Sequence, residues 1–196
     1  MHAPMRDQHI RPFLLRELAL IHAEQPDTLI VEELGVRQGD RRVDVAAING
    51  ELHGYEIKSE ADDLERLAGQ AEAYGAVFDR MTLVAATCHV ADAARMIPAW
   101  YGIIEVDEVE GRPRLTESRP ANPNPGRDAL SVAQLLWRDE ALVLLARRIP
   151  GQRFDKCRRR ELIAQVALVV PLEEIGSAVR AALKVRTDWR GAPRSS

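Results

Sequence analysis

Three charged residues near the middle of the chain have the types and spacing expected of a hydrolytic site. Asp44 lies in one β-rich segment, and Glu56 and Lys58 lie at the end of the next. Side chains alternate between the two faces of a strand, so Glu56 and Lys58 point the same way while Ile57 points into the opposite layer. One face of the second segment therefore presents a carboxylate beside an ammonium group.

These groups would suit a divalent metal if Asp44 shares the face of Glu56. The two carboxylates and the main-chain carbonyl of Ile57 then form an all-oxygen ligand set, which favours Mg²⁺ or Mn²⁺ over zinc. Lys58 would lie beside the metal, where an ammonium group can orient a water or stabilise charge on a phosphoryl oxygen. The spacing therefore predicts metal-assisted hydrolysis of a phosphodiester.

The pattern D-x(n)-E-x-K at the end of a hairpin resembles the signature of the PD-(D/E)XK nuclease superfamily. The residues that follow, SEADDLERLAGQAEAYGAVFDRMTLVAA, resemble a small bacterial subfamily with EIKSE-x-D and then RL-x-x-Q-x-x-x-Y on the next helix. The likeness covers roughly residues 6 to 106, and the segment LLWRDE at 135–140 extends it. Val43 stands where the superfamily has its proline.

The resemblance implies a fold, an activity and a set of site residues. The fold would be an α/β, restriction-endonuclease-like core with a mixed β-sheet flanked by helices. The activity would be that of a metal-dependent DNA nuclease, a phosphodiesterase that uses Mg²⁺ or Mn²⁺. Its catalytic residues, by position in the motif, would be Asp44, Glu56, Lys58 and Gln70.

Further acidic ligands are expected from the first helix and the first strand. Glu17 falls near the centre of the apolar stripe of a helix expected over residues 6–24, and the resemblance implies that an acidic residue there points at the metal. A carboxylate at the margin of the interface, or paired with an arginine, stays open. In the strand expected over 28–36, Glu33 is preferred to Glu32 as a ligand, with a solvated charge as the alternative.

Gln70 and Tyr74 lie one turn apart on a helix expected over residues 62–79. Gln70 is expected to contact the attacking water or a phosphate, and Tyr74 to contact nucleic acid. An exposed polar helix face is the alternative for both residues.

The remaining pattern places strands between helices after an antiparallel hairpin, which predicts a mixed sheet with helices on both faces. We divide the chain into a nuclease-like core (1–117), a Pro- and Asn-rich linker (118–130) and a helical C-terminal region (131–196). The expected elements beyond those above are strands at 81–86 and 100–106 and helices at 89–96, 131–148, 159–169 and 172–186, with Ser131 as an N-cap.

The C-terminal region contains a basic cluster in which Arg158, Arg159 and Arg160 could grip a nucleic-acid backbone. A solvated face with cations near helix ends is an equal alternative. The same helices could dock a second copy of the chain, in a homodimer, or a partner protein. A binding or docking module without turnover is thus the alternative to a nuclease.

Composition sets broad limits. The formal net charge of −3 does not by itself indicate a nucleic-acid binder, and no transmembrane run is visible. The N-terminus lacks the apolar core of a signal peptide, and the two cysteines show no metal-ligand spacing. We therefore expect a cytoplasmic protein that does not interact with a membrane.

The register of the central hairpin decides whether a site exists. A regular two-residue turn at Asn49-Gly50 would put Asp44 and Glu56 on opposite faces of the sheet. We therefore predict an even sum of paired residue numbers, produced by a three-residue loop or by a bulge. The predicted loop is Ile48-Asn49-Gly50, with Ala47 paired to Glu51 and Gly50 left-handed.

Overall fold

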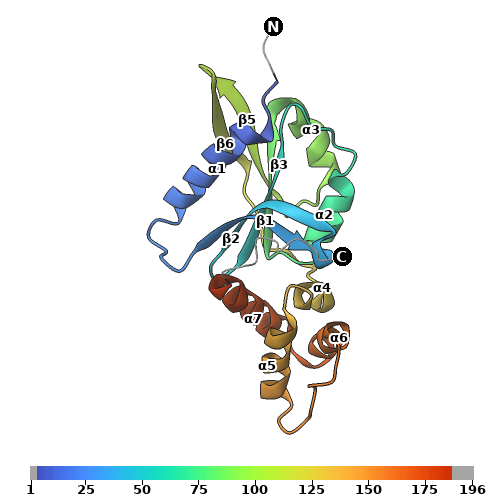
Figure 1. Cartoon of the computed structure of the whole chain (residues 1–196). Helices are drawn as coiled ribbons and strands as arrows, with labels where there is room; N and C mark the ends of the chain where they lie inside the picture. The colour runs from blue at the N-terminus through green and yellow to red at the C-terminus, as the bar shows by residue number, and fades with distance from the viewer. Residues whose placement is uncertain (1–3, 187–196) are drawn as a thin grey trace, which may run out of the picture.

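A computed structural model describes residues 4–186 of the chain (Figure 1). Its core is one six-stranded sheet with helices on both sides, followed by four C-terminal helices (Figure 1). The elements, in chain order, are α1 (Asp7–Ile21), β1 (Leu29–Val36), the 3₁₀ helix η1 (Arg37–Gly39), β2 (Arg41–Ile48), β3 (Leu52–Lys58), α2 (Leu67–Gly75), β4 (Arg80–Ala86), α3 (Thr87–Met96), β5 (Gly102–Val109), β6 (Arg112–Arg119), α4 (Ala129–Ala133), α5 (Arg138–Arg148), α6 (Arg159–Val169) and α7 (Leu172–Val185).

The strands lie in the sheet in their chain order, β1 to β6. The first three strands pair antiparallel, β3, β4 and β5 pair parallel, and β6 returns antiparallel at the edge. The parallel pairs are joined by crossovers through α2 and α3, as parallel strands require. The predicted α/β class with a mixed sheet and flanking helices is confirmed.

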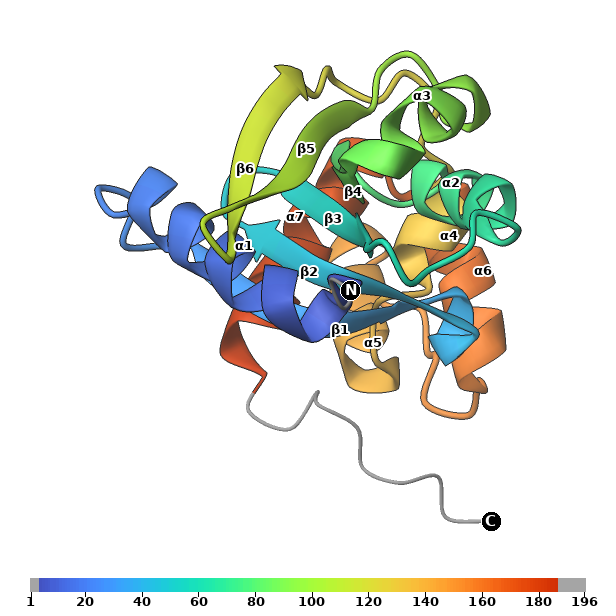
Figure 2. The same ribbon diagram turned by 90° about the horizontal axis from the view of Figure 1, so that it is seen from above.

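The two faces of the sheet pack against different helices (Figure 2). Ile10, Leu14 and Leu18 of α1 cover the face that carries Tyr55 and Ile57 of β3. The opposite face packs against α2, α3 and the C-terminal helices in one continuous apolar core. Alternation along β3 therefore turns Glu56 and Lys58 away from α1 and towards α2.

The β2–β3 hairpin has the even register on which the site depends. Ile48 pairs with Leu52 and Val45 with Tyr55, so the loop has three residues and every sum of paired numbers is 100. The details of the predicted loop were wrong. The loop is Asn49–Glu51 rather than 48–50, and Gly50 does not have a positive φ. Instead, the side chain of Asn49 accepts a hydrogen bond from the backbone N–H of Glu51 at 3.0 Å, an Asx turn that closes the loop.

Two core elements differ from the sequence prediction. The helix expected from residue 62 begins at Leu67, because Asp62 accepts hydrogen bonds from the backbone and hydroxyl of Ser59 and closes a local turn. Strand β6 was not predicted. Its residues, RPRLTESR, are mostly exposed, as suits an edge strand protected by charges and a proline.

Residues 118–130 are not a free linker, and this prediction was wrong. Residues 118 and 119 belong to β6, and the following segment is fixed to the core. The side-chain amide of Asn124 donates to the carbonyls of Gly75 and Phe78 at 2.6 and 2.8 Å, and Arg127 pairs with Asp79 at 2.6 Å. Such bonds satisfy buried carbonyls at the end of α2, which explains how a Pro- and Asn-rich segment holds one conformation.

The C-terminal helices share the core of the sheet rather than forming a separate one. The single helix expected over 131–148 is two helices, α4 and α5, and the N-cap of α4 is Asp128 rather than Ser131. The helices expected at 159–169 and 172–186 are observed as α6 and α7. No helix of residues 4–186 combines the length and the apolar character needed to cross a bilayer.

Candidate functional site

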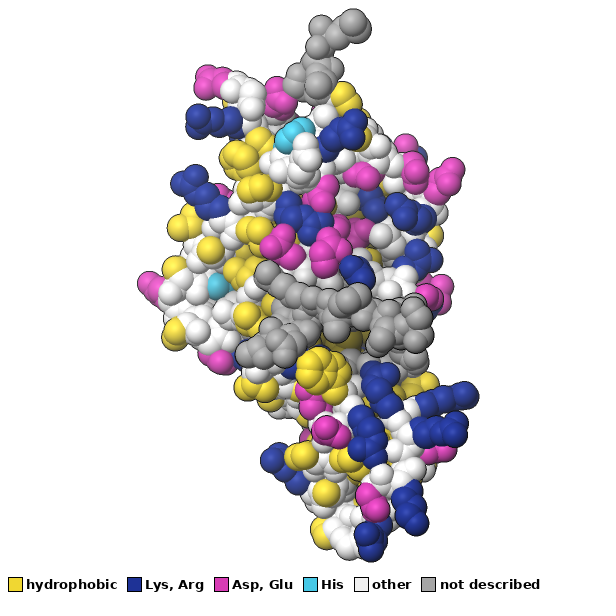
Figure 3. All heavy atoms as spheres, in the orientation of Figure 1, with side chains coloured by type: hydrophobic (Ala, Val, Ile, Leu, Met, Phe, Trp, Pro, Cys, Tyr) yellow, Lys and Arg dark blue, Asp and Glu magenta, His cyan; other side chains and the backbone are white. Residues whose placement is uncertain are grey.

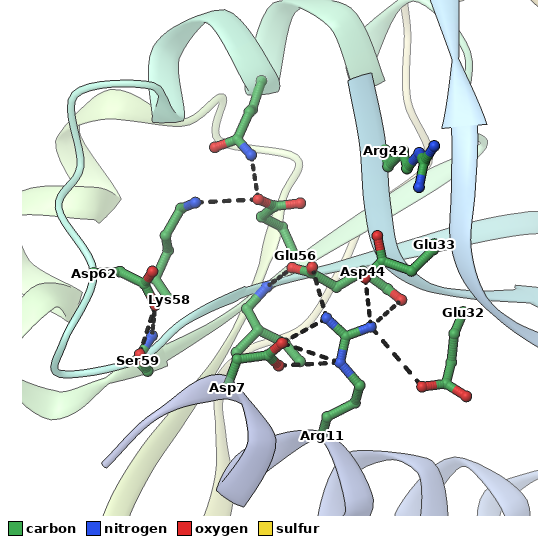
Figure 4. Close-up of polar contacts among 12 residues, drawn as sticks. Asp7, Arg11, Glu32, Glu33, Arg42, Asp44, Glu56, Lys58, Ser59 and Asp62 are labelled. Carbon is green, nitrogen blue, oxygen red and sulfur yellow. Dashed lines mark hydrogen bonds and ion pairs between the residues drawn. The ribbon is translucent and has the colours of Figure 1, made fainter. Parts of the chain in front are cut away.

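Asp44 lies where β2 leaves β3. The β2–β3 ladder ends at Val45 and Tyr55, while β2 continues to pair with β1 as far as Arg41. In the gap that opens, the carboxylate of Asp44 accepts a hydrogen bond from the backbone N–H of Ile57, with Oδ2 at 2.7 Å (Figure 4). Extending the register by one residue sets Asp44 opposite Glu56, closer than the diagonal position we expected.

Glu56, Lys58 and Gln70 form a buried cluster between β3 and α2. Glu56 and Lys58 are 4% and 5% exposed. The Lys58 ammonium donates to Glu56 Oε1 at 3.1 Å, and the side-chain amide of Gln70 donates to the same oxygen (Figure 4). A buried carboxylate paired with a buried cation and an amide is costly to assemble, which is typical of sites under functional constraint.

Two oxygens of this cluster have no partner. Glu56 Oε2 and Gln70 Oε1 are buried, and neither accepts a hydrogen bond from any described residue. An unpaired buried acceptor costs on the order of 1–3 kcal/mol, and such groups usually await a ligand or an ion. Both atoms are hard oxygens of the kind that bind Mg²⁺.

Burial raises the pKa values of both carboxyl groups. Loss of solvent raises the pKa of Glu56 to about 7, helped by the negative charge of Asp44 and opposed by Lys58. Burial raises the pKa of Asp44 to about 6, against the hydrogen bond from Ile57 and the charge of Arg11. Two neighbouring acids that resist ionisation near neutral pH gain from a nearby cation.

Arg11 is the residue that the sequence analysis missed. Its guanidinium pairs with Asp44 Oδ1 at 3.0 Å, with Asp7 at 2.6 Å and with Glu33 at 2.8 Å (Figure 4). Asp7 and Arg11 are one helical turn apart, so the i, i+4 pair of opposite charges on α1 was the available signal. Our sequence reasoning looked for a lone carboxylate on the apolar stripe instead.

The arrangement fits a divalent cation. Among residues 4–186, the ion pairs of the site connect five carboxyl groups, those of Asp7, Glu32, Glu33, Asp44 and Glu56, to only Arg11 and Lys58. As the side chains stand, no three acidic, histidine or cysteine side chains of the described chain converge in a metal-binding geometry. Mg²⁺ commonly takes one or two carboxylates and completes its shell with water and phosphate oxygens, so Asp44 and Glu56 suffice.

The two further acidic candidates have different outcomes. Glu33 points at the site through Arg11, is half exposed, and has a positive φ of 56°, a conformation that non-glycine residues adopt at a cost. Its role as a direct ligand stays a prediction. Glu17 is exposed, about 120° around α1 from Arg11, so the expected burial on the apolar stripe was wrong. Ile57 contacts Asp44 through its N–H, and the role of its carbonyl stays a prediction.

Tyr74 is a structural residue rather than a nucleic-acid contact, so that prediction was wrong. Its side chain is 1% exposed, and its hydroxyl donates to the backbone carbonyl of Arg42 at 2.6 Å. Burial raises the pKa of this phenol, so it stays a neutral donor. The bond ties α2 to β2 and thereby fixes the position of Gln70 over Glu56.

The basic triplet of the C-terminal region divides into two kinds of residue. Arg158 and Arg160 are exposed, and basic side chains gather over α6 and the segment before it (Figure 3). Arg159 instead donates to the carbonyl of Leu136 at 2.9 Å and to that of Gln134, at the end of α4. Arg159 is therefore wrongly placed among the nucleic-acid contacts, because its guanidinium satisfies a helix C-terminus.

The raised pKa of Glu56 predicts a pH-dependent stability. Between pH 4.5, its ordinary value, and about 7, the folded protein holds a proton that the unfolded chain has released, so stability falls as pH rises through this window. In EDTA at about pH 8, Glu56→Gln should therefore raise the free energy of unfolding by about 2 kcal/mol. At about pH 4, Glu56→Gln and the wild type should differ little. Urea unfolding at both values checks this, with exposed Glu17→Gln as the control. Wild-type stability that rises from pH 4.5 to 7 would contradict it.

Comparisons with known proteins give one family. The family described as Bacteriophage P4 protein cII matches residues 2–190. Protein cII of Enterobacteria phage P4 is 34% identical over 79 residues, which cover 40% of this chain and 30% of that relative. A solved protein of unknown function from Silicibacter pomeroyi is 25% identical, with a TM-score of 0.41 over 73% of this chain and 94% of that one. Since the family match spans nearly the whole chain, this protein belongs to the bacteriophage P4 protein cII family.

Proposed function

We propose that this protein is a metal-dependent DNA nuclease of the PD-(D/E)XK type, which hydrolyses phosphodiester bonds. The observation that carries the proposal is the buried cluster around Glu56. One oxygen of that carboxylate is held by Lys58 and Gln70 while the other has no partner in the described chain. A stability role alone would leave no reason to bury an unsatisfied carboxylate oxygen beside a second acid.

The proposed chemistry divides among residues of three elements. Asp44 and Glu56 would hold Mg²⁺ or Mn²⁺, which supplies Lewis-acid stabilisation of the phosphoryl oxygens and lowers the pKa of water. Lys58, held by Glu56 at 3.1 Å, would orient the attacking water or balance charge that develops in the transition state. Gln70, fixed by α2, would orient the carboxylate of Glu56 and accept a hydrogen bond from water through Oε1.

For DNA contact we propose the exposed arginines Arg158 and Arg160. They lie in the basic patch that Figure 3 shows on the face that also displays the acidic and basic side chains around the upper strands. Exposed arginines can neutralise phosphates without sequence preference. We also propose a cytoplasmic location, which the two free cysteines, Cys88 and Cys157, support.

A binding or docking module without turnover is the second candidate, and metal dependence separates it from a nuclease. Because all proposed ligand atoms are hard oxygens, Mg²⁺ and Mn²⁺ should support cleavage, and Ca²⁺ should support binding with little turnover. The measurement is cleavage of labelled single-stranded, duplex and branched DNA by the purified protein. Full activity in excess EDTA would refute the metal mechanism, and binding without cleavage under every metal would favour the module.

A further inference from the structure

Arg11 occupies the place where a second cation would approach Asp44. All three guanidinium nitrogens are used: Nε contacts Asp7 at 3.1 Å, Nη2 contacts Asp44 Oδ1 at 3.0 Å, and Nη1 contacts Glu33 at 2.8 Å and the Asp44 carbonyl at 3.1 Å. The side chain is 14% exposed. Arg11 is thus fixed in the site rather than placed on its rim.

Both carboxylate oxygens of Asp44 are therefore engaged. Oδ1 accepts from Arg11 and Oδ2 accepts from the backbone of Ile57. A divalent metal bound to Oδ1 would lie about 2.0–2.1 Å from it, on an oxygen that already carries a guanidinium nitrogen at 3.0 Å. Two cations on one oxygen at such distances repel each other strongly in a partly buried site.

Arg11 can leave Asp44 without becoming an unpaired buried charge. Asp7 and Glu33 already bind it, and Glu32 lies at 3.9 Å from Nη1. Because Glu32 and Glu33 are 38% and 49% exposed, a shift of the guanidinium towards them moves it into solvent. The acidic residues around Arg11 thus offer it a second position.

We propose that Arg11 and the divalent metal compete for the carboxylate of Asp44, so that Arg11 sets the metal affinity of the site. This inference rests on the proposed nuclease function and adds a residue outside the D-x(n)-E-x-K motif. Arg11 is a positioning residue in the metal-free protein, where it holds Asp44 and offsets its charge. Metal binding requires the guanidinium to move towards Glu32 and Glu33.

The test measures Mn²⁺ affinity without DNA, by electron paramagnetic resonance of free Mn²⁺. Arg11→Gln should bind Mn²⁺ about tenfold or more tightly, within the roughly 5- to 150-fold range of coupled sites. The matched control is Arg42→Gln, since Arg42 is an exposed arginine near the site (Figure 4) whose side chain forms no ion pair in the described chain. Arg42→Gln should change the affinity less than about threefold, because it removes charge without freeing Asp44.

The outcomes separate the inference from the proposed function. If wild type binds Mn²⁺, Asp44→Asn loses it and Arg11→Gln is unchanged or weaker, competition is wrong while the metal site stands. An equal gain in Arg42→Gln would also overturn it in favour of general electrostatics. Absence of Mn²⁺ binding by both wild type and Arg11→Gln overturns the inference and the metal mechanism together. If Arg11→Gln does not fold by circular dichroism, Arg11→Lys decides, since one ammonium cannot hold Asp44, Asp7 and Glu33 at once, and its unchanged affinity overturns competition.

Discussion

Asp44→Asn should reduce DNA cleavage by about a thousandfold, equivalent to about 4 kcal/mol of transition-state stabilisation. Asparagine keeps one oxygen that can accept from the N–H of Ile57, so the gap between β2 and β3 stays bridged. It loses the negative charge that would hold the metal and that now pairs with Arg11. The loss should therefore appear in metal affinity and in cleavage together. Single-turnover cleavage at several Mn²⁺ concentrations measures both.

The control for this substitution is Glu17→Gln. Glu17 lies on the same helix as Arg11 but is exposed on another side, so its neutralisation should leave cleavage unchanged. Because Asp44 is partly buried and its pKa is raised to about 6, Asp44→Asn should not destabilise the fold at neutral pH. Cleavage by Asp44→Asn at the wild-type rate would exclude this site as the catalytic one.

The sequence was sufficient to predict the strands that position the site. Alternation put Glu56 and Lys58 on one face, and the structure turns both towards α2, where Gln70 meets them. The requirement for an even register also predicted that the obvious two-residue turn at Asn49 and Gly50 does not form. That inference used the geometry of strands alone. The loop details failed because the Asx turn of Asn49 replaces the left-handed glycine on which we relied.

What could not be predicted depends on contacts between distant segments. Arg11 reaches Asp44 across 33 positions of sequence, and nothing in the helix pattern around Arg11 points to β2. The docking of residues 120–128 depends on carbonyls at the end of α2 that accept from Asn124. Local composition reads such a segment as a linker, because tertiary hydrogen bonds are absent from any local signal. Strand β6 was missed for a related reason, since an exposed edge strand lacks apolar alternation.

Lys58→Met should lower the cleavage rate by about 10²- to 10³-fold while leaving DNA affinity within about threefold. Lys58 is 5% exposed and its ammonium lies within the Glu56 cluster, where DNA phosphates that only bind the surface would not reach it. Methionine keeps most of the apolar stem and removes the charge. Removing that charge also raises the pKa of Glu56 further, because Lys58 now lowers it. Single-turnover rates should therefore be measured at about pH 8.5 with saturating Mn²⁺, so that reduced metal binding does not contribute.

The reverse pattern is expected from the basic patch, which makes it the matched control. Neutralising Arg158 and Arg160 together should weaken DNA binding and lower its salt slope by up to about two, one per lost phosphate contact, with the single-turnover rate at saturation unchanged. Arg159 is left intact because it binds the carbonyl of Leu136 and its loss would disturb α4. If Lys58→Met weakened DNA binding as much as the double variant did, while the bound DNA was cut at the wild-type rate, Lys58 would be a binding group and the assigned chemistry would be wrong. Loss of rate at retained affinity, opposite to the double variant, is what a lysine acting on the transition state requires.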